Sequence, residues 1–221
     1  MPFVDRTDAG HRLAAALGKF RSQKPVVLAL PRGGVPVAKE IAAELGGGID
    51  LVLVRKIGVP DQPELAMGAV VDGLDPLTVR NEDVINLAGV SEAGFNSVRD
   101  RELAEIRRRR TEYLGDRAPP DLAGRVVIVV DDGIATGATT RAALRAVRRQ
   151  SPRRLILAVP VAPTDTLREL EPEADEIVCL EAHDVFGSIG AFYSDFAQVS
   201  DREVKEILAA FPVEAREGTA T

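Results

Sequence analysis

Short apolar runs alternate with amphipathic stretches along the chain. The runs are rich in Val, Ile and Leu without polar residues in between, which is typical of strands buried on both faces of a sheet. They cover Val26–Leu30, Asp50–Val54, Val126–Val130, Leu155–Val161 and Glu176–Leu180. Such strands separated by helical patterns predict an α/β fold, a parallel sheet flanked by helices.

Helices are predicted in the amphipathic stretches. Ser200 and Glu203 have capping-box spacing at the start of the last of them. Residues Gly115–Ala123, with two adjacent prolines, predict a linker into the next strand. The expected helices are Gly10–Phe20, Val35–Leu45, Ser91–Tyr113, Thr140–Gln150, Pro163–Leu170 and Asp201–Phe211.

The segment from Arg55 to Gly68 interrupts this alternation. It is polar, contains Pro60 and Pro63, and carries the adjacent cations Arg55 and Lys56. A long connection without structure of its own is commonly a functional lid or disordered. We therefore expect a mobile loop here.

The composition is that of an ordinary globular protein. The 221 residues suit a single domain spanning 1–221, and a hydrophobic content of 45% is enough for a sizeable core. No apolar run approaches the roughly 20 residues of a membrane span. The first residues lack a basic region followed by an apolar stretch, as a secretory signal would have. We expect a cytoplasmic protein.

The net charge and the numbers of cysteine and histidine residues argue against nucleic-acid binding, disulfide bonding and soft-metal binding. The net charge of −6 argues against a nucleic-acid partner. Arg107–Arg110 could be an RNA patch, but Glu105 precedes Arg109 by four residues, which favours a solvated helix face. The single cysteine, Cys179, allows no internal disulfide and is expected to be a small buried hydrophobe. With only two histidines, no soft-metal cluster is expected.

The strongest candidate site follows the third strand. The sequence from Val126 to Thr140 reads VVIVVDDGIATGATT: a buried strand, two carboxylates, and a small-residue loop that opens a helix. Ligands of open α/β sheets bind beyond the carboxyl ends of strands. Small residues let backbone N–H groups approach a phosphate, and the helix N-terminus adds partial positive charge. Carboxylates suit neighbouring ribose hydroxyls, so the pattern indicates a sugar phosphate.

The same string resembles the binding motif for phosphoribosyl pyrophosphate (PRPP) of type I phosphoribosyltransferases. The resemblance implies that Asp131 and Asp132 bind the ribose diol. It implies a 5′-phosphate cradle at the residues that follow. These PRPP-binding residues are Gly133, Ala135, Thr136, Gly137, Ala138 and Thr139. Further features match a bacterial family of such enzymes with an unnamed acceptor. They are Asp5-Arg6, Ala9-Gly10, Pro31–Gly34 and Phe192–Phe196.

A second anion site is predicted at Leu30–Pro36, where a strand ends, two glycines free the backbone and Arg32 stands beside a helix start. The resemblance makes this the pyrophosphate loop, with Arg32 and Gly33 binding PRPP and a non-proline cis peptide at Arg32–Gly33. Arg55 and Lys56 would close over pyrophosphate. An exposed arginine at a tight turn and solvated loop cations are the plainer alternatives.

The catalytic residues implied are Arg32, Arg55, Lys56, Asp131 and Asp132. Mg²⁺, held mainly by PRPP, would stabilise the departing pyrophosphate together with the cations. The acceptor is a nitrogenous base or similar small molecule. The protein could be a homodimer, the commonest oligomer.

The acceptor pocket is expected under a small hood formed by the first residues and about 181–200. Phe186 and Tyr193 could stack on a ring, although such aromatics equally suit a core. Glu64 is a weak acid–base candidate. Ala135 occupies the position where 6-oxopurine enzymes carry an aspartate, so the motif looks more like that of adenine-specific enzymes.

Two other functions stay open. One is a regulator of the same fold that senses PRPP or nucleotides without catalysis. The other, a nucleotide-binding oxidoreductase, lacks the glycine fingerprint Gly-x-Gly-x-x-Gly.

Overall fold

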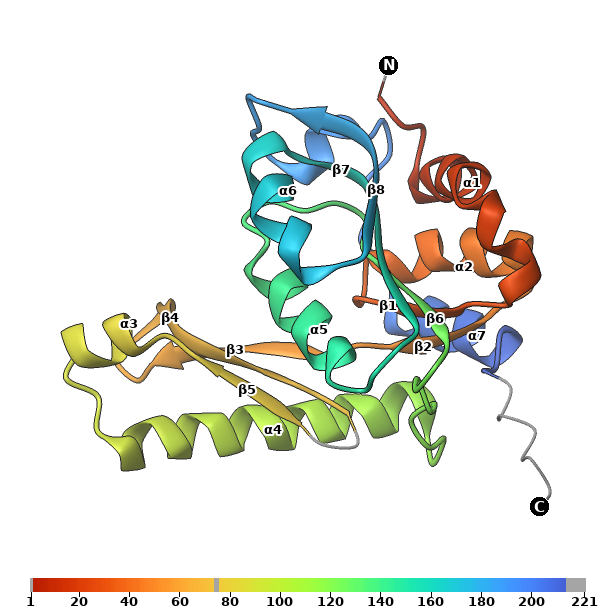
Figure 1. The fold of residues 1–221 in the computed structure, drawn as a ribbon. Coiled ribbons are helices and arrows are strands. Elements are labelled where there is room, and N and C mark those ends of the chain that lie inside the picture. Colours follow the sequence, from red (N-terminus) through yellow and green to blue (C-terminus); the bar gives the residue numbers. More distant parts are fainter. Residues whose placement is uncertain (1, 74–75, 214–221) are drawn as a thin grey trace.

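A five-stranded parallel sheet forms the centre of the computed structural model, which describes residues 2–73 and 76–213 (Figure 1). The strand order is β2-β1-β6-β7-β8, and each neighbouring pair is parallel. The predicted fold class is thereby confirmed. The strands are β1 Val26–Ala29, β2 Gly48–Leu51, β6 Val126–Val130, β7 Arg154–Pro163 and β8 Glu176–His183.

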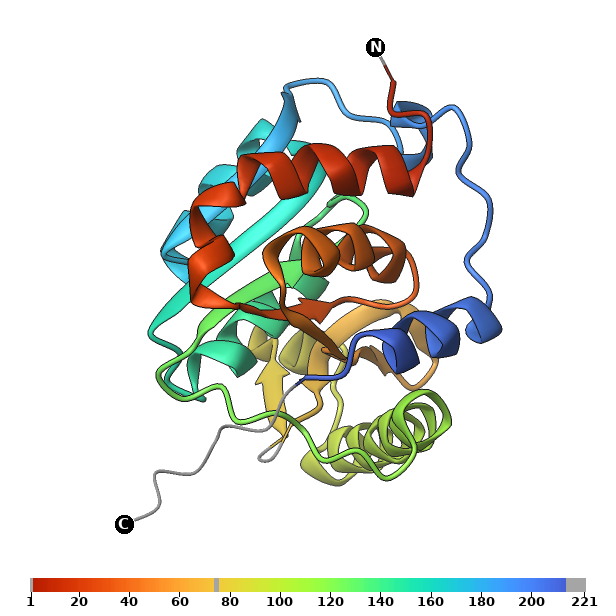
Figure 2. The same ribbon diagram turned by 90° about the vertical axis from the view of Figure 1, so that its right-hand side faces the viewer.

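Helices cover both faces of this sheet. Successive strand residues point to opposite faces, so Ile128 and Val130 pack in one apolar cluster while Val127 and Val129 pack in another. Figures 1 and 2 show two helices, α1 and α2, on one face, with α5 and α6 on the other. The helices are α1 Arg6–Ala16, α2 Gly34–Leu45, α5 Ala138–Arg148, α6 Thr164–Leu170 and α7 Asp201–Ala210, with 3-10 helices at Gly18–Gln23, Glu171–Glu173 and Ile189–Phe192.

The first helix begins four residues earlier than predicted. The side chain of Asp5 caps it by accepting a hydrogen bond from the Asp8 amide at 2.8 Å. It gives way to a 3-10 helix from Gly18, so that Phe20 is buried outside regular α-helix. The cap places Arg6 in the first turn.

Residues 54–73 and 76–114 form an arm that projects from the parallel sheet (Figure 1). The arm was not predicted as a sheet: Arg55–Gly68, expected to be a loop, forms β3 and most of β4. Pro60 and Pro63 favoured a loop, because proline is confined to the edges and ends of strands, but they lie at and just after the turn between β3 and β4, and Ile57 and Met67 are fully buried. The arm consists of an antiparallel sheet, β3 Val54–Val59, β4 Gln62–Val71 and β5 Leu77–Arg80, followed by α3 Glu82–Leu87 and α4 Glu92–Leu114.

A buried ion cluster joins the arm to the parallel sheet. Arg110 of α4 contacts Asp72, which follows β4, at 2.8 Å and Asp50 of β2 at 3.3 Å. Both carboxylates also accept hydrogen bonds from backbone N–H groups. Burial raises the pKa of Asp72 to about 6 despite the arginine. Arg108 and Arg109 pair with Glu105 on the surface, as a solvated helix face would, whereas Arg110 turns inward.

In the part of the chain that the structure describes, no helix is both long enough and apolar enough to span a membrane.

Replacing Arg110 with methionine is expected to lower the free energy of unfolding by about 3–5 kcal/mol at pH 8, because two buried carboxylates lose their counter-ion. The loss should be smaller at pH 5. The folded-state pKa of Asp72 lies above its unfolded value, so mild acid protonates the group and relieves the unpaired charge. Urea unfolding at both pH values measures this.

Arg107→Met is the matched control for this experiment, because Arg107 is exposed on the same helix. Its effect should stay within about 0.5 kcal/mol. Equal losses for Arg110→Met at pH 5 and pH 8 would contradict the role of the buried carboxylates.

Candidate functional site

The loops that follow β1 and β6 meet at the carboxyl edge of the parallel sheet. The two strands are neighbours, yet the chain leaves β1 toward β2 on one side and continues from β6 toward β7 on the other. The Leu30 amide donates to the Val130 carbonyl at 2.9 Å across this junction. A reversal of strand order of this kind opens a crevice in which ligands of α/β proteins bind.

The loop after β6 is the first candidate anion site. Helix α5 begins at Ala138, and its N-cap is Gly137 in the left-handed conformation, with φ of 72° and no side-chain cap. A β-carbon at Gly137 would approach the Thr166 methyl at 2.7 Å. The first N–H groups of the helix are therefore left for a ligand. Thr136 and Thr139 are exposed beside them.

The loop after β1 is the second candidate anion site. Helix α2 has Gly33 as its N-cap, again without a side-chain cap. The non-proline cis peptide lies at Pro31–Arg32, one bond before the predicted Arg32–Gly33. The Arg32 guanidinium is 3.5 Å from the Asp201 carboxylate of α7. Asp201 also accepts a hydrogen bond from the Tyr113 hydroxyl, at 2.6 Å.

The two carboxylates of the motif have different surroundings. Asp132 is 8% exposed, and its Oδ2 lies 2.7 Å from Nε of Arg6. A β-carbon on Gly33 would overlap the same carboxylate. Asp131 is partly buried, and its carboxylate accepts a hydrogen bond from the Asp132 amide at 2.9 Å. Burial and the adjacent Asp132 charge raise the pKa of Asp131 well above its usual value.

Arg55 and Lys56 point to opposite faces of the antiparallel sheet, because adjacent strand residues alternate. Arg55 faces α4, where it pairs with the buried Glu102 at 2.7 Å. Lys56 lies opposite Ala69 in the strand register and bonds Glu64 at 3.2 Å. Arg55 and Lys56 therefore lie in a strand and not in the expected loop, and both are paired with carboxylates of the protein. Of the two, Lys56 shares a face of the sheet with Ala69.

The structure brings two of the three acceptor-pocket candidates together, because Phe186 and Tyr193 belong to one apolar cluster. Glu64 lies on the arm, where its side chain is 97% exposed and pairs with Lys56. Phe186 stacks on Phe192 with ring centroids 4.9 Å apart. Tyr193 is buried, and its hydroxyl donates to the Asp132 carbonyl at 2.6 Å, so its ring is a packing element rather than a free stacking surface.

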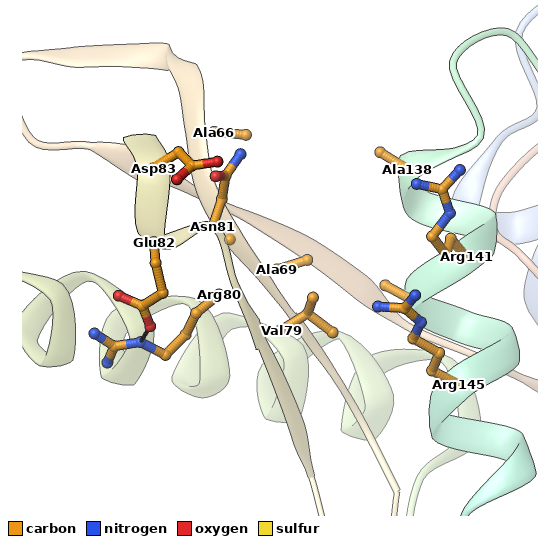
Figure 3. Close-up of a pocket in the computed structure, with 12 residues that line it drawn as sticks. Ala66, Ala69, Val79, Arg80, Asn81, Glu82, Asp83, Ala138, Arg141 and Arg145 are labelled. Carbon is orange, nitrogen blue, oxygen red and sulfur yellow. Dashed lines mark hydrogen bonds and ion pairs between the residues drawn. The ribbon is translucent and has the colours of Figure 1, made fainter. Parts of the chain in front are cut away.

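A cavity of about 450 Å³ separates the arm from α5 (Figure 3). Its floor consists of small side chains, among them Ala69 and Ala138. Arg141 and Arg145 line it from α5, but they are paired with Glu169 and Glu173 outside it. Because Ala138 is the first residue of α5, the cavity adjoins the candidate anion site after β6.

No group of three or more His, Cys, Asp or Glu side chains suited to a metal occurs within residues 2–73 and 76–213. Mg²⁺ uses one or two carboxylates together with substrate phosphates. In its ionised form, Asp131 would supply one such carboxylate to an ion that arrives on a pyrophosphate.

Sequence reasoning assigned no role to the groups that hold the candidate residues. Arg6 contacts Asp132, Asp201 contacts Arg32, and Glu102 contacts Arg55. These partners lie 47 to 169 positions away along the chain. The capping residue Asp5, just before Arg6, was the one local signal that could have pointed to the first pair.

Comparisons with known proteins agree on one family. The model of the phosphoribosyl transferase domain matches residues 7–197. Two Mycobacterium tuberculosis proteins named as predicted phosphoribosyl transferases, MT0597 of strain CDC 1551 and Rv0571c of strain H37Rv, are each 43% identical over 206 residues. These matches cover 93% of this chain and 46% of each relative, so the chain spans about half the length of these relatives.

A solved structure is also similar along nearly the whole chain. The crystal structure of the protein TT1426 from Thermus thermophilus matches with a TM-score of 0.81 and 41% identity. The match covers 96% of this chain and 99% of that chain.

Gly33→Ala is expected to destabilise the protein by about 1–3 kcal/mol, because the new methyl group would overlap the Asp132 carboxylate. Gly18→Ala is the control, since a β-carbon there meets nothing within 4 Å. Thermal and urea unfolding measure both variants. Equal stability of the two would show that Asp132 can move away from Gly33 without cost.

Proposed function

Because the chain belongs to the phosphoribosyl transferase family, we propose that it transfers the phosphoribosyl group of PRPP to a nitrogenous acceptor and releases pyrophosphate. The observation that carries the proposal is that two helices without a side-chain cap at their N-termini, α2 and α5, follow the neighbouring strands β1 and β6 at one edge of the sheet. PRPP has a phosphate at one end and a pyrophosphate near the other, so it needs two such anion sites.

The 5′-phosphate is assigned to the loop before α5. Its three negative oxygens would accept hydrogen bonds from the first N–H groups of the helix and from the hydroxyls of Thr136 and Thr139. Gly137 allows the close approach. The ribose hydroxyls would then lie near Asp131 and Asp132. They would donate hydrogen bonds, which the carboxylate oxygens accept.

Pyrophosphate is assigned to the loop before α2. During transfer the bond between the anomeric carbon and pyrophosphate breaks as the acceptor nitrogen bonds to that carbon, so positive charge develops on the sugar and negative charge on the leaving group. Arg32 and the N–H groups around Gly33 would stabilise the leaving group. Bound Mg²⁺ would supply further charge neutralisation at the pyrophosphate.

The arm would act as the cover of the site. Lys56 lies on its face toward α5, and it would reach pyrophosphate by exchanging the Glu64 carboxylate for a phosphate oxygen. Arg55 would have to leave the buried Glu102, a costly exchange. We therefore assign the closing role to Lys56 and a structural role to Arg55. Exclusion of water would prevent hydrolysis of PRPP.

A PRPP-sensing regulator of the same fold is the second candidate. One observation favours it: Arg32, Arg55 and Lys56 are each paired with a carboxylate of the protein itself. A sensor needs binding without the rearrangement that catalysis demands. The net charge of −6 speaks against RNA as its partner.

PRPP with Mg²⁺ is expected to raise the melting temperature by several degrees, because a ligand at 100-fold its dissociation constant stabilises the folded state by about 2.7 kcal/mol. Thr136→Val and Asp131→Asn should remove the shift. Thr111→Val, an exposed threonine on α4, should keep it. Undiminished shifts in both site variants would refute the assignment of the crevice to PRPP.

Pyrophosphate release in a screen of bases distinguishes the enzyme from the sensor, since a sensor binds PRPP without consuming it. Little or no turnover is expected with hypoxanthine or guanine. Ala135, at the position of the catalytic aspartate of 6-oxopurine enzymes, can neither accept a proton nor donate a hydrogen bond through its side chain. Adenine and other heterocycles are the acceptors to test first. Efficient use of guanine would contradict the meaning given to Ala135.

A further inference from the structure

Arg6 connects three parts of the chain at the crevice. Its Nε lies 2.7 Å from Oδ2 of Asp132, and Nη1 donates to the Ala197 carbonyl at 2.7 Å. Its guanidinium lies over the Phe196 ring, 3.9 Å from the centroid. The side chain is only 12% exposed. These three contacts and the low exposure hold the Arg6 side chain in a single orientation.

Asp132 depends on that arginine. A carboxylate withdrawn from water is costly unless an opposite charge or hydrogen-bond donors compensate for it. The cation of Arg6 provides this compensation on one side, while Gly33 closes the other. The Asp132 carbonyl is fixed separately by the Tyr193 hydroxyl. Both the backbone and the side chain of Asp132 are thus held by residues far from it in sequence.

A short parallel ladder places Arg6 where it can do this. The Phe3 amide donates to the Phe192 carbonyl, and the amides of Ser194 and Asp195 donate to the carbonyls of Phe3 and Val4, each at 2.8 Å. Phe3 is fully buried. The ladder brings the start of α1 and the segment 192–197 together directly beside the crevice.

We propose that Arg6 is a positioning residue for the ribose subsite: it holds the Asp132 carboxylate against Gly33 in the orientation that PRPP requires. The inference rests on the proposed function. It adds a group from the first turn of α1 to a site otherwise built from the β1 and β6 loops. Arg6 acts through Asp132, and it need not touch the sugar.

A double-mutant cycle tests this pathway of action. PRPP dissociation constants in the presence of Mg²⁺ are measured by calorimetry for the wild type, Arg6→Met, Asp132→Asn and the double variant. Arg6→Met should weaken binding by about tenfold, equivalent to about 1.4 kcal/mol. Once Asp132 is asparagine, removing Arg6 should cost little more, because the charge that it positions is gone.

Arg12→Met is the matched control. Arg12 lies on the same helix and over the ring of Phe3, 5.0 Å from its centroid, but its ion pair is with Asp8 on the surface. Its PRPP affinity should equal that of the wild type. Melting temperatures without ligand are recorded for every variant, since a merely structural role of Arg6 would lower stability and leave the affinity of the folded protein unchanged.

Phe196→Ala keeps the test decisive if Arg6→Met does not fold. This ring is 37% exposed, and it packs against both Arg6 and the Tyr193 ring. Its loss loosens the surface that orients Arg6 while leaving the guanidinium in place, so binding should weaken by about threefold. Wild-type affinity in Arg6→Met, or in Phe196→Ala where Arg6→Met does not fold, would overturn the inference alone, as would independent effects of Arg6→Met and Asp132→Asn. A wild-type protein that does not bind PRPP would overturn the proposed function, and the inference with it.

Discussion

The contact between the Asp132 carboxylate and Gly33 sets the spacing of the two loops on which the site depends. A side chain at position 33 would occupy the same space as the carboxylate, so the β1 and β6 loops can approach each other only because residue 33 is glycine. This approach places the starts of α2 and α5 after two neighbouring strands. The two candidate anion sites therefore depend on how tightly two backbone segments pack, and not on the number of basic side chains present.

Charge in this protein is largely compensated before any ligand arrives. Arg6 is paired with Asp132, Arg32 with Asp201, and Arg55 with Glu102. Backbone N–H groups at the helix starts lack such competitors among side chains. An anionic ligand would thus be recognised first by the backbone, while recruitment of Arg32 requires an exchange of partners with Asp201.

Buried ion pairs also attach the arm to the parallel sheet. Arg110 joins Asp50 of the parallel sheet to Asp72 of the arm, so the position of the arm over α5 is fixed at its base by buried charge. Farther out, the cavity of Figure 3 lies between the arm and α5, with small residues such as Ala69 and Ala138 and charged ones such as Arg141 in its lining. The arm is thus firmly attached at one end and has space beneath it near the phosphate loop.

The sequence by itself determined the parallel sheet, most of its helices and the two loops of the crevice. It could do so because buried strands are continuous apolar runs, and because a glycine-rich strand–helix junction is a local pattern. It did not reveal the antiparallel sheet of the arm, because Pro60 and Pro63, at and just after the turn between β3 and β4, are local signals for a loop, and only the packed structure shows that Ile57 and Met67 are buried there. The division of Arg55 and Lys56 between two faces followed only from their being in a strand. The partners of Arg32 and Asp132 were decided by the tertiary structure alone, since Asp201 and Arg6 reach them from opposite ends of the chain, and long-range charge pairing leaves no periodic trace in the sequence.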